Sequence, residues 1–463
     1  CGVKEGDRVA LLLYDSPEFI ASFLAIAAEG AIGVLINTFL PPRDIAFILS
    51  DSGARTLIAE QPLWSKLLSS GGENVSAACG GGRVTPILIQ DEDRPCLNAT
   101  KTARLLQPVA ATTEETPAFL LYTSGSTGAP KGVLHRHGAV PVTVDGYSRH
   151  VLQLTREDRL FSASRLFFAY GLGNSLSFPL ADGATVILET ERPAPEKIAA
   201  LFKEKSPTVF FGVPATYRGL LEYQANGGQV DASSLRLCIS AGEALPEKVF
   251  EDWQNEFGLT ILDGIGSTEM LQMFISNRQG EARPGSSGKV IEGYEAKLID
   301  QNGQPVTTGE LGYLWIRGGS AAAGYWDRPD LTQATIQDGW VRTGDIYRKD
   351  EDGYYYHIGR ADDCFKVHGL WVSPIEVESV LAMHDSVVEA AVIAAEDADG
   401  LATAKAFVVI REGRESEALR RELMEFAGAR LPRYKAPSQI EFVREMPRTS
   451  TGKIQRYKLR SNP

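Results

Sequence analysis

A run of hydroxyl and glycine residues closed by a lysine indicates chemistry most directly in this sequence. Tyr122-Thr123-Ser124-Gly125-Ser126-Thr127-Gly128-Ala129-Pro130-Lys131-Gly132 follows the apolar run Ala118-Phe119-Leu120-Leu121, which predicts a buried strand leading into a loop. Glycines let backbone N–H groups approach a ligand closely, hydroxyl groups add donors, and the lysine adds positive charge. The loop therefore predicts a site for an anionic ligand such as the phosphates of ATP.

The spacing of this loop differs from that of the Walker A motif. In Walker A the lysine is followed by Ser or Thr at the start of a helix, whereas here the order is Lys131-Gly132-Val133. A flexible surface linker is the alternative interpretation, but linkers seldom follow a buried strand so directly. We expect the phosphate-binding residues to be Thr123, Ser124, Gly125, Ser126, Thr127, Gly128 and Lys131.

A second cluster, Asp263-Gly264-Ile265-Gly266-Ser267-Thr268-Glu269-Met270, stands at the end of an apolar strand. Strand carboxyl ends are where α/β folds place ligands. Thr268 can donate to a phosphate oxygen, and Glu269 can hold the Mg²⁺ that neutralises ATP. The alternative is a turn with a solvated glutamate, which the phosphate loop makes less attractive.

Three weaker clusters complete the set. Ser240 to Pro246 is a strand-to-helix turn whose glycine permits close approach to a flat base. Asp345 could accept both ribose hydroxyls, and Arg360 could reach a phosphate or the ribose, although an ordinary surface ion pair is the alternative. Lys453 follows Thr451-Gly452 near the C-terminus, where a lysine is commonly a solvated tail residue.

The composition is that of an ordinary globular enzyme. The 463 residues are 43% hydrophobic and 23% charged, and the formal net charge is −12. This charge argues against nucleic acid or an anionic membrane surface as a partner, and no apolar run is long enough to span a bilayer. The five cysteines form no Cys-x-x-Cys pair, so neither a disulfide framework nor a zinc site is indicated. We interpret His135 and His137 as loop residues and expect a cytoplasmic protein.

Strand and helix patterns alternate along most of the chain. Ser16-Pro17-Glu18 predicts a helix start, and Gly30 predicts its end. This α/β pattern is typical of mostly parallel sheets covered by helices. Buried strands are expected at 8–13, 31–36, 55–59, 185–188, 208–211, 235–239 and 261–263, with helices at 41–50, 195–203, 214–223 and 246–257.

The pattern changes twice toward the C-terminus. From about residue 289, short β segments at 294–299, 312–317 and 354–358 predict a small β subdomain. After Asp362, helices at 374–383 and 415–428 and strands at 387–393, 404–410 and 440–443 predict a compact α+β unit. We therefore expect a large N-terminal domain over residues 1–361 and a small, mobile C-terminal domain over 362–463. The chain opens on a turn before a strand, so we expect residues to precede Cys1.

These motifs resemble those of the adenylate-forming superfamily, which unites acyl-CoA synthetases, peptide-synthetase adenylation domains and firefly luciferase. The resemblance covers essentially the whole chain, because the motifs occur in the family's order. They are the glycine loop, Gly264–Glu269, Thr343-Gly344-Asp345, Gly359-Arg360-Ala361-Asp362-Asp363 and Thr451-Gly452-Lys453. A more specific likeness to benzoate-CoA ligases and their hydroxy- and aminobenzoate relatives lies in Phe167–Asn174, Gly266–Leu271 and Val367–Pro374.

The resemblance implies roles for these residues. The glycine loop would wrap the β- and γ-phosphates of ATP, Thr268 would touch the α-phosphate, and Glu269 would bind Mg²⁺. Asp345 would hold the ribose, and Lys453 would contact the carboxylate and α-phosphate oxygens during adenylation. Asp362 would be the hinge of the mobile domain. The adenine would be bordered by Gly242, Glu243, Ala244, Asp263 and Gly264, and the pantetheine tunnel would be lined by Val367, His368, Gly369, Leu370 and Trp371.

The acyl pocket is expected to be a flat slot suited to a benzene ring, since glycines and an aromatic wall would line it. The benzoate-CoA ligases commonly carry His-Ile where this chain has Gln272-Met273. A glutamine can bond a ring amino or hydroxyl group, which favours a substituted benzoate such as 2-aminobenzoate. The expected lining residues are Ala169, Tyr170, Gly171, Ile265, Gly266, Met270, Gln272 and Met273.

The implied activity is an aryl-CoA ligase that uses ATP, Mg²⁺, coenzyme A and an aromatic carboxylic acid. Two alternatives stay open: an aryl-acid adenylation enzyme that loads a carrier protein, and a non-catalytic nucleotide-binding protein. Intact Glu269, Asp345 and Lys453 argue against the second alternative. The sequence leaves the oligomeric state undetermined, with a homodimer as one option.

Overall fold

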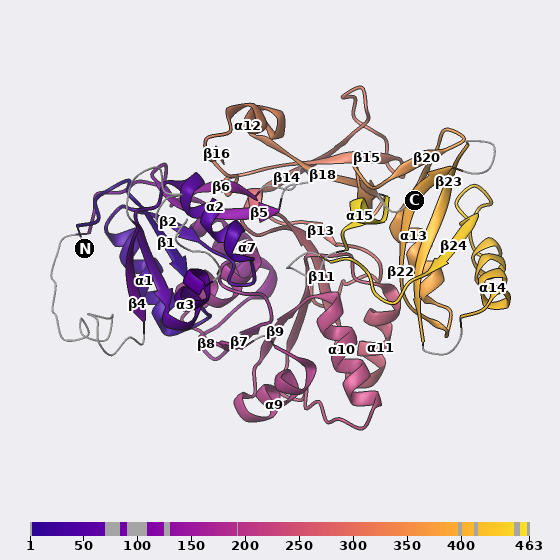
Figure 1. Ribbon diagram of the computed structural model, residues 1–463, viewed down its shortest axis with the longest axis horizontal. Coiled ribbons are helices and arrows are strands. Elements are labelled where there is room, and N and C mark those ends of the chain that lie inside the picture. The colour runs from indigo at the N-terminus through magenta and orange to yellow at the C-terminus, as the bar shows by residue number, and fades with distance from the viewer. Residues whose placement is uncertain are drawn as a thin grey trace. The chain divides into compact units, whose positions relative to one another are not determined.

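Figure 1 shows the computed structural model, which describes residues 2–69, 84–89, 109–124, 130–191, 193–396, 401–411, 415–448 and 454–460. The chain forms two compact units. The first contains Cys1–Ala296 and Trp315–Arg342, and the second contains Lys297–Leu314 and Thr343–Pro463. The expected fold class, parallel-rich α/β followed by a smaller α+β part, is confirmed.

The first sheet of unit one has seven strands in the order β16-β6-β5-β2-β1-β3-β4. The pairs from β5 to β4 are parallel, whereas β6 and β16 run antiparallel at one edge. The strands are β1 (Arg8–Leu12), β2 (Ile32–Leu35), β3 (Thr56–Glu60), β4 (Thr85–Ile89), β5 (Pro117–Ser124), β6 (Pro130–Arg136) and β16 (Gly324–Tyr325).

Helices cover both faces of this sheet, because alternate residues of each strand face opposite sides. Val9 and Leu11 pack with α1 (Pro17–Ala28) in one buried cluster. Ala10 and Leu12 pack with α2 (Pro42–Ser52) and α3 (Gln61–Ser69) in another. Helix α1 begins as predicted, since the Ser16 side chain accepts from the Phe19 N–H at 3.3 Å.

The second sheet repeats this plan, with the order β13-β12-β11-β10-β9-β7-β8. Its pairs from β11 to β8 are parallel, and β12 and β13 are antiparallel. The strands are β7 (Arg159–Ser162), β8 (Thr185–Ile187), β9 (Val209–Gly212), β10 (Leu237–Ser240), β11 (Ile261–Gly266), β12 (Met273–Ser276) and β13 (Lys289–Val290). In both sheets, the last parallel strand is followed in sequence by the first antiparallel strand of the edge.

Three helices cover one face of the second sheet: α9 (Pro195–Lys205), α10 (Pro214–Ala225) and α11 (Glu247–Phe257). Figure 1 shows α10 and α11 side by side. Short helical segments complete the unit. They are α6 (Ala139–Thr143), the π-helices η1 (Val144–Leu152) and η2 (Gly173–Ser177), α7 (Ala169–Leu172), α8 (Phe178–Asp182), the 3-10 turn η3 (Thr268–Met270) and α12 (Pro329–Thr335).

A third sheet contains residues that belong to both units. Its strand order is β14-β15-β18-β17, and β19 also pairs with β18. The bounds are β14 (Tyr294–Ile299), β15 (Leu311–Gly318), β17 (Ile336–Gln337), β18 (Trp340–Lys349) and β19 (Tyr355–Arg360). These strands correspond to the short β segments expected after residue 289.

The second unit is built on a three-stranded sheet in the order β22-β23-β24, with a two-stranded hairpin, β20-β21. Helices α13 and α14 pack on one face of the three-stranded sheet, and Leu459 of α15 packs on the other with Ile393 and Phe407. The bounds are β20 (Phe365–Val367), β21 (Leu370–Val372), α13 (Pro374–Ala382), β22 (Val387–Glu396), β23 (Ala402–Ile410), α14 (Glu417–Gly428), β24 (Gln439–Phe442) and α15 (Arg456–Arg460).

Among the described residues, no helix combines the length and the apolar character that a membrane span needs.

Candidate active site

The predicted phosphate loop joins the antiparallel strands β5 and β6. Thr123 pairs with Lys131, and Tyr122 pairs with Gly132, so the base of the loop holds two of the predicted ligands opposite each other. The predicted ligands Gly125, Ser126, Thr127 and Gly128, and the side chain of Ser124, lie outside the described residues.

The base of this hairpin is fixed by a carboxylate on α2, Asp51, whose side chain is 9% exposed. The Tyr122 hydroxyl donates to Oδ2 of Asp51 at 2.8 Å, and Arg328 donates to Oδ1 at 2.6 Å. Burial and the Asp51 carboxylate raise the pKa of Tyr122, which therefore remains a donor. Gly132 leaves room for this ring, since a Cβ there would lie 3.0 Å from it. The strand that bears Lys131 is thus held by contacts outside the hairpin.

The second predicted cluster forms a tight turn after β11. The Ser267 hydroxyl accepts from the Met270 N–H at 3.3 Å and caps the turn. Thr268 and Glu269 follow this cap and are partly exposed. The Tyr325 hydroxyl donates to Oε1 of Glu269 at 2.6 Å, which orients the carboxylate.

A buried histidine brings these two clusters together. His135, four residues after Lys131, lies on β6, and its Nε2 is 2.8 Å from the carbonyl oxygen of Thr268. The prediction that His135 is a loop residue is wrong: its side chain is fully buried and stacks on Phe119 with ring centroids 5.3 Å apart. Burial lowers the pKa of His135 to about 4, so the ring is neutral and Nε2–H donates. Because histidine is polar, nothing in the sequence indicated that this position is buried. The pairing of β6 with β5 buries it.

The predicted adenine border lies at the ends of β10 and β11, where Ser240 pairs with Asp263. Gly242 has a φ of 89°, which glycine adopts without strain, and Glu243 is exposed. Asp263 is 7% exposed, and its Oδ1 has no hydrogen-bond partner among the described residues. Burial raises the pKa of Asp263 well above its usual range. A buried carboxyl oxygen without a partner fits a ligand that brings a polar group, such as the amino group of adenine.

The predicted acyl-pocket residues come from two segments that contact each other. Gln272 donates through Nε2 to the Tyr170 carbonyl oxygen at 3.2 Å and to Asn174 Oδ1 at 3.4 Å. Its Oε1 accepts from the Met273 N–H at 3.0 Å. Gln272 is 3% exposed, and Met270 and Met273 are also buried. The contacts join α7, which carries Ala169 to Gly171, to the start of β12.

Glycines allow close packing in and between these two segments. A Cβ at Gly171 would lie 2.0 Å from the Arg165 carbonyl oxygen, and one at Gly173 would lie 2.1 Å from Nε2 of Gln272. On β11, a Cβ at Gly266 would lie 2.6 Å from the Gln272 carbonyl oxygen. The Gly173 contact lies between the two segments, whereas Gly171 packs against the chain before α7 and Gly266 packs within the turn from β11 to β12. A larger residue at any of the three would loosen the proposed pocket wall.

The predicted ribose site is a buried carboxylate in the second unit. Oδ1 of Asp345 lies 3.2 Å from Nη1 of Arg360 and 3.4 Å from Nε2 of His357. Burial alone would raise the pKa of Asp345, but His357 and Arg360 outweigh it and hold the pKa below its usual range. The Asp345 side chain is 9% exposed while that of Arg360 is 53% exposed, unlike an ordinary surface pair in which both groups are solvated. Gly344 makes room for the guanidinium, since a Cβ there would lie 2.8 Å from Nη2.

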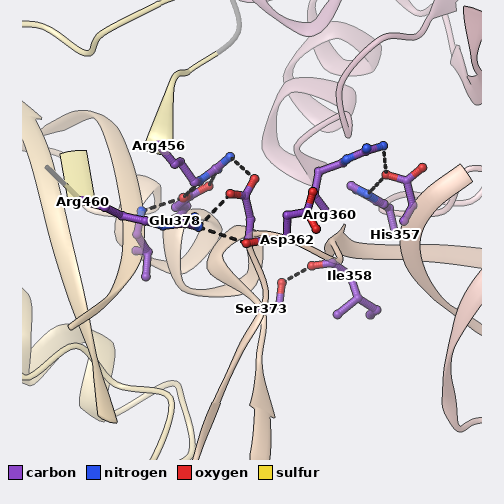
Figure 2. Close-up of polar contacts among 11 residues, drawn as sticks. His357, Ile358, Arg360, Asp362, Ser373, Glu378, Arg456 and Arg460 are labelled. Atoms are coloured by element: carbon purple, nitrogen blue, oxygen red, sulfur yellow. Dashed lines mark hydrogen bonds and ion pairs between the residues drawn. The ribbon is translucent and has the colours of Figure 1, made fainter. Parts of the chain in front are cut away.

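The main chain of the predicted hinge residue, Asp362, is hydrogen-bonded to an ion-pair network in the second unit (Figure 2). Arg460 donates through Nη2 to the Asp362 carbonyl oxygen at 3.2 Å and to Asp363 Oδ1 at 2.9 Å. Arg456 donates through Nη2 to both carboxylate oxygens of Glu378, at 2.9 and 2.8 Å. Lys453 lies outside the described residues, but these bonds fix the helix that begins three residues after it.

The residues predicted to line the pantetheine tunnel form the β20-β21 hairpin. Val367 pairs with Leu370, and the turn residues His368 and Gly369 have φ values of 50° and 80°. Positive φ at both turn positions is the geometry of a type I′ hairpin. The side chains of His368 and Leu370 are exposed, and Lys366 Nζ lies 4.9 Å from the ring centroid of Trp371.

The predicted residues therefore fall in both units. The first unit holds the phosphate hairpin, the Thr268–Glu269 turn, the adenine border and the acyl-pocket residues, and the second holds Asp345, Arg360, Asp362 and the 368–371 hairpin. Sequence reasoning missed His135 and Tyr325, whose partners Thr268 and Glu269 are distant in sequence, so no local spacing pointed to them.

Known proteins are similar to this chain over nearly its whole length. Residues 1–326 match the AMP-binding enzyme family, and residues 376–453 match the AMP-binding enzyme C-terminal domain. A benzoate–CoA ligase from Thauera aromatica is 44% identical over 469 residues, covering 99% of this chain and 86% of that protein. An anthranilate–CoA ligase from Pseudomonas aeruginosa is 36% identical over 471 residues, covering 99% of this chain and 87% of that protein.

Solved structures give the same result. The anthranilate CoA ligase AuaEII in complex with anthranoyl-AMP has a TM-score of 0.90 and 41% identity, covering 99% of this chain and 88% of that chain. A benzoate CoA ligase from Burkholderia xenovorans has a TM-score of 0.89 and 40% identity, covering 99% of this chain and 90% of that chain. Because fold and sequence agree over this length, the resemblance drawn from the motifs is confirmed, and the chain belongs to the AMP-binding enzyme family.

Proposed function

We propose that this protein is an AMP-forming aryl-CoA ligase. The carboxylate of an aromatic acid attacks the α-phosphorus of ATP, which forms aryl-AMP and releases pyrophosphate. The thiol of CoA then attacks the acyl carbon, loses its proton, and displaces AMP. The observation that carries the proposal is the turn after β11: it presents Thr268 and Glu269 and is bonded through His135 to the strand that follows the phosphate loop. Relatives that are benzoate– and anthranilate–CoA ligases support the choice of reaction.

The first step brings two anions together, so its barrier is largely electrostatic. We assign Lys131 and the loop residues Ser124 to Gly128 to the β- and γ-phosphates, and Thr268 to the α-phosphate. Lys453 contacts the carboxylate and α-phosphate oxygens as they meet. Asp263 and residues 242–244 border the adenine, and Asp345 with Arg360 holds the ribose. No protein nucleophile is required, because the substrate carboxylate and the CoA thiol are the two attacking groups.

The residues present fit Mg²⁺ at Glu269. Carboxylate oxygens are the ligands this hard cation prefers in proteins, and the Tyr325 bond to Oε1 orients the Glu269 carboxylate. When bound, the ion neutralises charge on the ATP phosphates. The protein's part is to hold the carboxylate at a fixed position beside Thr268.

We propose a benzoate or a substituted benzoate, such as 2-aminobenzoate, as the acid. The close packing at Gly171, Gly173 and Gly266 supports a narrow, flat pocket wall suited to an aromatic ring. The contacts of Gln272 with Tyr170, Asn174 and Met273 favour a wall role for this side chain over a bond to a ring substituent. The choice of ring substituent therefore rests on other residues of the pocket.

We propose that residues 362–463 form the domain that moves between the two steps, with Asp362 as its hinge and the 368–371 hairpin serving the CoA step. Asp362→Pro, which locks φ, should slow thioester formation while leaving aryl-AMP formation in place. Normal thioester formation in this variant would show that Asp362 is not the hinge. A cytoplasmic location and a homodimer are further parts of the proposal, to be checked by fractionation and by light scattering.

Two assays test the reaction. Exchange of pyrophosphate into ATP should depend on an aromatic acid, and AMP release should then depend on CoA. The acids to compare are benzoate, 2-aminobenzoate, 4-hydroxybenzoate, salicylate, acetate and octanoate, with the benzoates expected to be turned over most efficiently. Absence of acid-dependent exchange would contradict an adenylating enzyme. Exchange without CoA-dependent AMP release would instead point to a carrier protein as the acceptor.

A further inference from the structure

The turn that carries Thr268 and Glu269 ends in a strained backbone conformation. Leu271 has φ 65° and ψ −38°, and the Gln272 N–H donates to the Met270 carbonyl oxygen at 2.7 Å. These values correspond to the γ-turn with positive φ, which is rare and strained. Leucine has no glycine-like freedom here, and it is 4% exposed. Such a conformation persists only where surrounding contacts determine it, and it is concentrated at functional sites.

Donors from outside the turn hold three of its successive carbonyl oxygens. His135 Nε2 lies 2.8 Å from the carbonyl oxygen of Thr268, and the Ala322 N–H donates to the carbonyl oxygen of Glu269 at 2.8 Å. The Ser320 hydroxyl donates to the carbonyl oxygen of Met270 at 2.8 Å. Every main-chain oxygen from Thr268 to Met270 therefore has its direction set by a group that lies elsewhere in the sequence.

The three donors belong to one connected piece of structure. Segment 320–325 follows β15 and leads into β16, which pairs with β6 at Tyr325 and Val133. The Ala323 N–H donates to the Leu134 carbonyl oxygen at 2.8 Å, next to His135 on β6. Because β6 begins at the end of the phosphate loop, the turn is positioned by the same strand that carries Lys131.

The two side-chain donors are buried and directional. Ser320 is fully buried, and its one proton is used on Met270, so the Tyr294 hydroxyl 2.8 Å away donates to it. His135 is fully buried, and its Nδ1 has no partner among the described residues. That arrangement matches the neutral tautomer with the proton on Nε2, and burial keeps the pKa of His135 low. Both side chains thus act as uncharged donors with one available target.

We propose that His135 and Ser320 are positioning residues that hold the strained turn from Thr268 to Gln272, so that one set of hydrogen bonds places both the Mg²⁺-binding carboxylate and the acyl-pocket wall. Neither side chain touches a substrate in this role. The inference rests on the proposed adenylation function of the turn. It implies that losing either donor impairs the first step, in which ATP and the acid must meet, and spares the second, in which CoA attacks a finished aryl-AMP.

The test compares the two half-reactions in variants at these positions. His135→Leu and Ser320→Ala should lower kcat for acid-dependent ATP–pyrophosphate exchange by roughly 10²-fold, the cost of misplacing a reacting group by about 1 Å. The KM values for both MgATP and the acid should rise. Thioester formation from supplied aryl-AMP and CoA should stay within about twofold of the wild-type rate.

Two further variants separate positioning from general loss of structure. His135→Gln keeps an uncharged N–H donor and should recover at least tenfold of the exchange rate lost in His135→Leu. Thr143→Val removes another buried hydroxyl of the same unit, one that bonds the Val140 carbonyl oxygen at 2.8 Å, and should leave exchange unchanged.

The outcomes distinguish this inference from the proposed function. Wild-type protein without acid-dependent exchange would reject the adenylation function itself. Wild-type exchange with full activity in His135→Leu and Ser320→Ala would overturn the positioning role alone. Equal loss in both half-reactions, or an effect of Thr143→Val as large as that of Ser320→Ala, would also overturn it, since either result is what general destabilisation produces.

Discussion

The two segments to which we assign the adenylation step are held in place by opposite means. In the first unit, the turn from Thr268 to Gln272 is held by uncharged donors, His135 and Ser320, on main-chain oxygens. In the second unit, the helix that follows Lys453 is held by charged pairs, Arg456 with Glu378 and Arg460 with Asp363. The first set acts on main-chain oxygens alone, whereas the second joins side chains through charge and adds one bond from Arg460 to the Asp362 carbonyl oxygen.

The difference indicates what each segment has to do. Short hydrogen bonds to buried carbonyl groups lose strength steeply with misalignment, so they allow essentially one geometry. Ion pairs act over longer distances and tolerate small displacements, although salt screens them where water reaches. We interpret the turn as a rigid template for Mg²⁺ and the acid, and the ion pairs as the support of the helix that follows the proposed catalytic Lys453.

The largest effect is expected when one of these ion pairs is broken. Arg456→Ala leaves the Glu378 carboxylate buried without its partner, since the two side chains are only 16% and 14% exposed. The free energy of unfolding of the second unit should fall by about 3–5 kcal/mol. Urea unfolding, with hydrogen exchange of β22 and β23 as the local readout, measures this loss. Arg420→Ala, at an exposed pair with Glu417, is the matched control and should cost no more than about 1 kcal/mol; a similar loss in both variants would contradict the contrast between the regions.

Lys453→Ala should remove the charge that we propose for the adenylation step. Acid-dependent ATP–pyrophosphate exchange should fall roughly 10²–10³-fold, the cost of one preorganised contact on developing charge. Thioester formation from supplied aryl-AMP should remain largely intact, because the charges have already met. Lys458→Ala, an exposed lysine of α15, should affect neither half-reaction. Equal damage by Lys453→Ala to both steps would reject the assignment of this lysine to adenylation.

The buried histidine of the first unit should make stability depend on pH. The folded-state pKa of His135 is about 4, below its ordinary value of 6.5, so the unfolded chain binds a proton that the folded protein does not. Its contribution is fully present above pH 6.5 and is lost as pH falls toward 4, up to roughly 3 kcal/mol. Unfolding measured from pH 7 to pH 4 should show a shallower fall for His135→Gln than for the wild type. Identical slopes would mean that His135 is not buried as a neutral ring.

The smallest effect is expected at Gln272, where the turn meets the acyl pocket. If its amide bonded a ring substituent, Gln272→Leu would spare benzoate and lower kcat/KM for 2-aminobenzoate by about 1–2 kcal/mol, or roughly 5–30-fold. Its bonds to Tyr170, Asn174 and Met273 favour the other outcome. We therefore expect Gln272→Leu to lower kcat/KM by the same factor for both acids, roughly 5–30-fold. A loss of kcat/KM for 2-aminobenzoate alone would support the hypothesis that Gln272 bonds a ring substituent.

Much of this protein could be predicted from the order of its residues. The apolar run 118–121 before the glycine loop indicated a strand, and β5 (Pro117–Ser124) lies there. Ser16-Pro17 indicated a helix start, and the Ser16 hydroxyl caps α1. The family and the expected ligands, ATP, Mg²⁺ and CoA, followed from motifs of a few adjacent residues, and the fold class followed from the alternation of strand and helix patterns. These features depend on local spacing, side-chain type and backbone freedom, which are properties of short stretches of chain.

The tertiary structure alone decided how those motifs are held together. His135 and Thr268 are 133 positions apart, and Glu269 and Tyr325 are 56 apart, so no period or short motif connects them. The positive φ of Leu271 was equally invisible, because leucine carries no preference for it. Such features arise only when β6 and segment 320–325 pack against the turn. A hydrogen bond depends on atoms brought within about 3 Å of each other, and for residues this distant in sequence only the folded chain sets that distance.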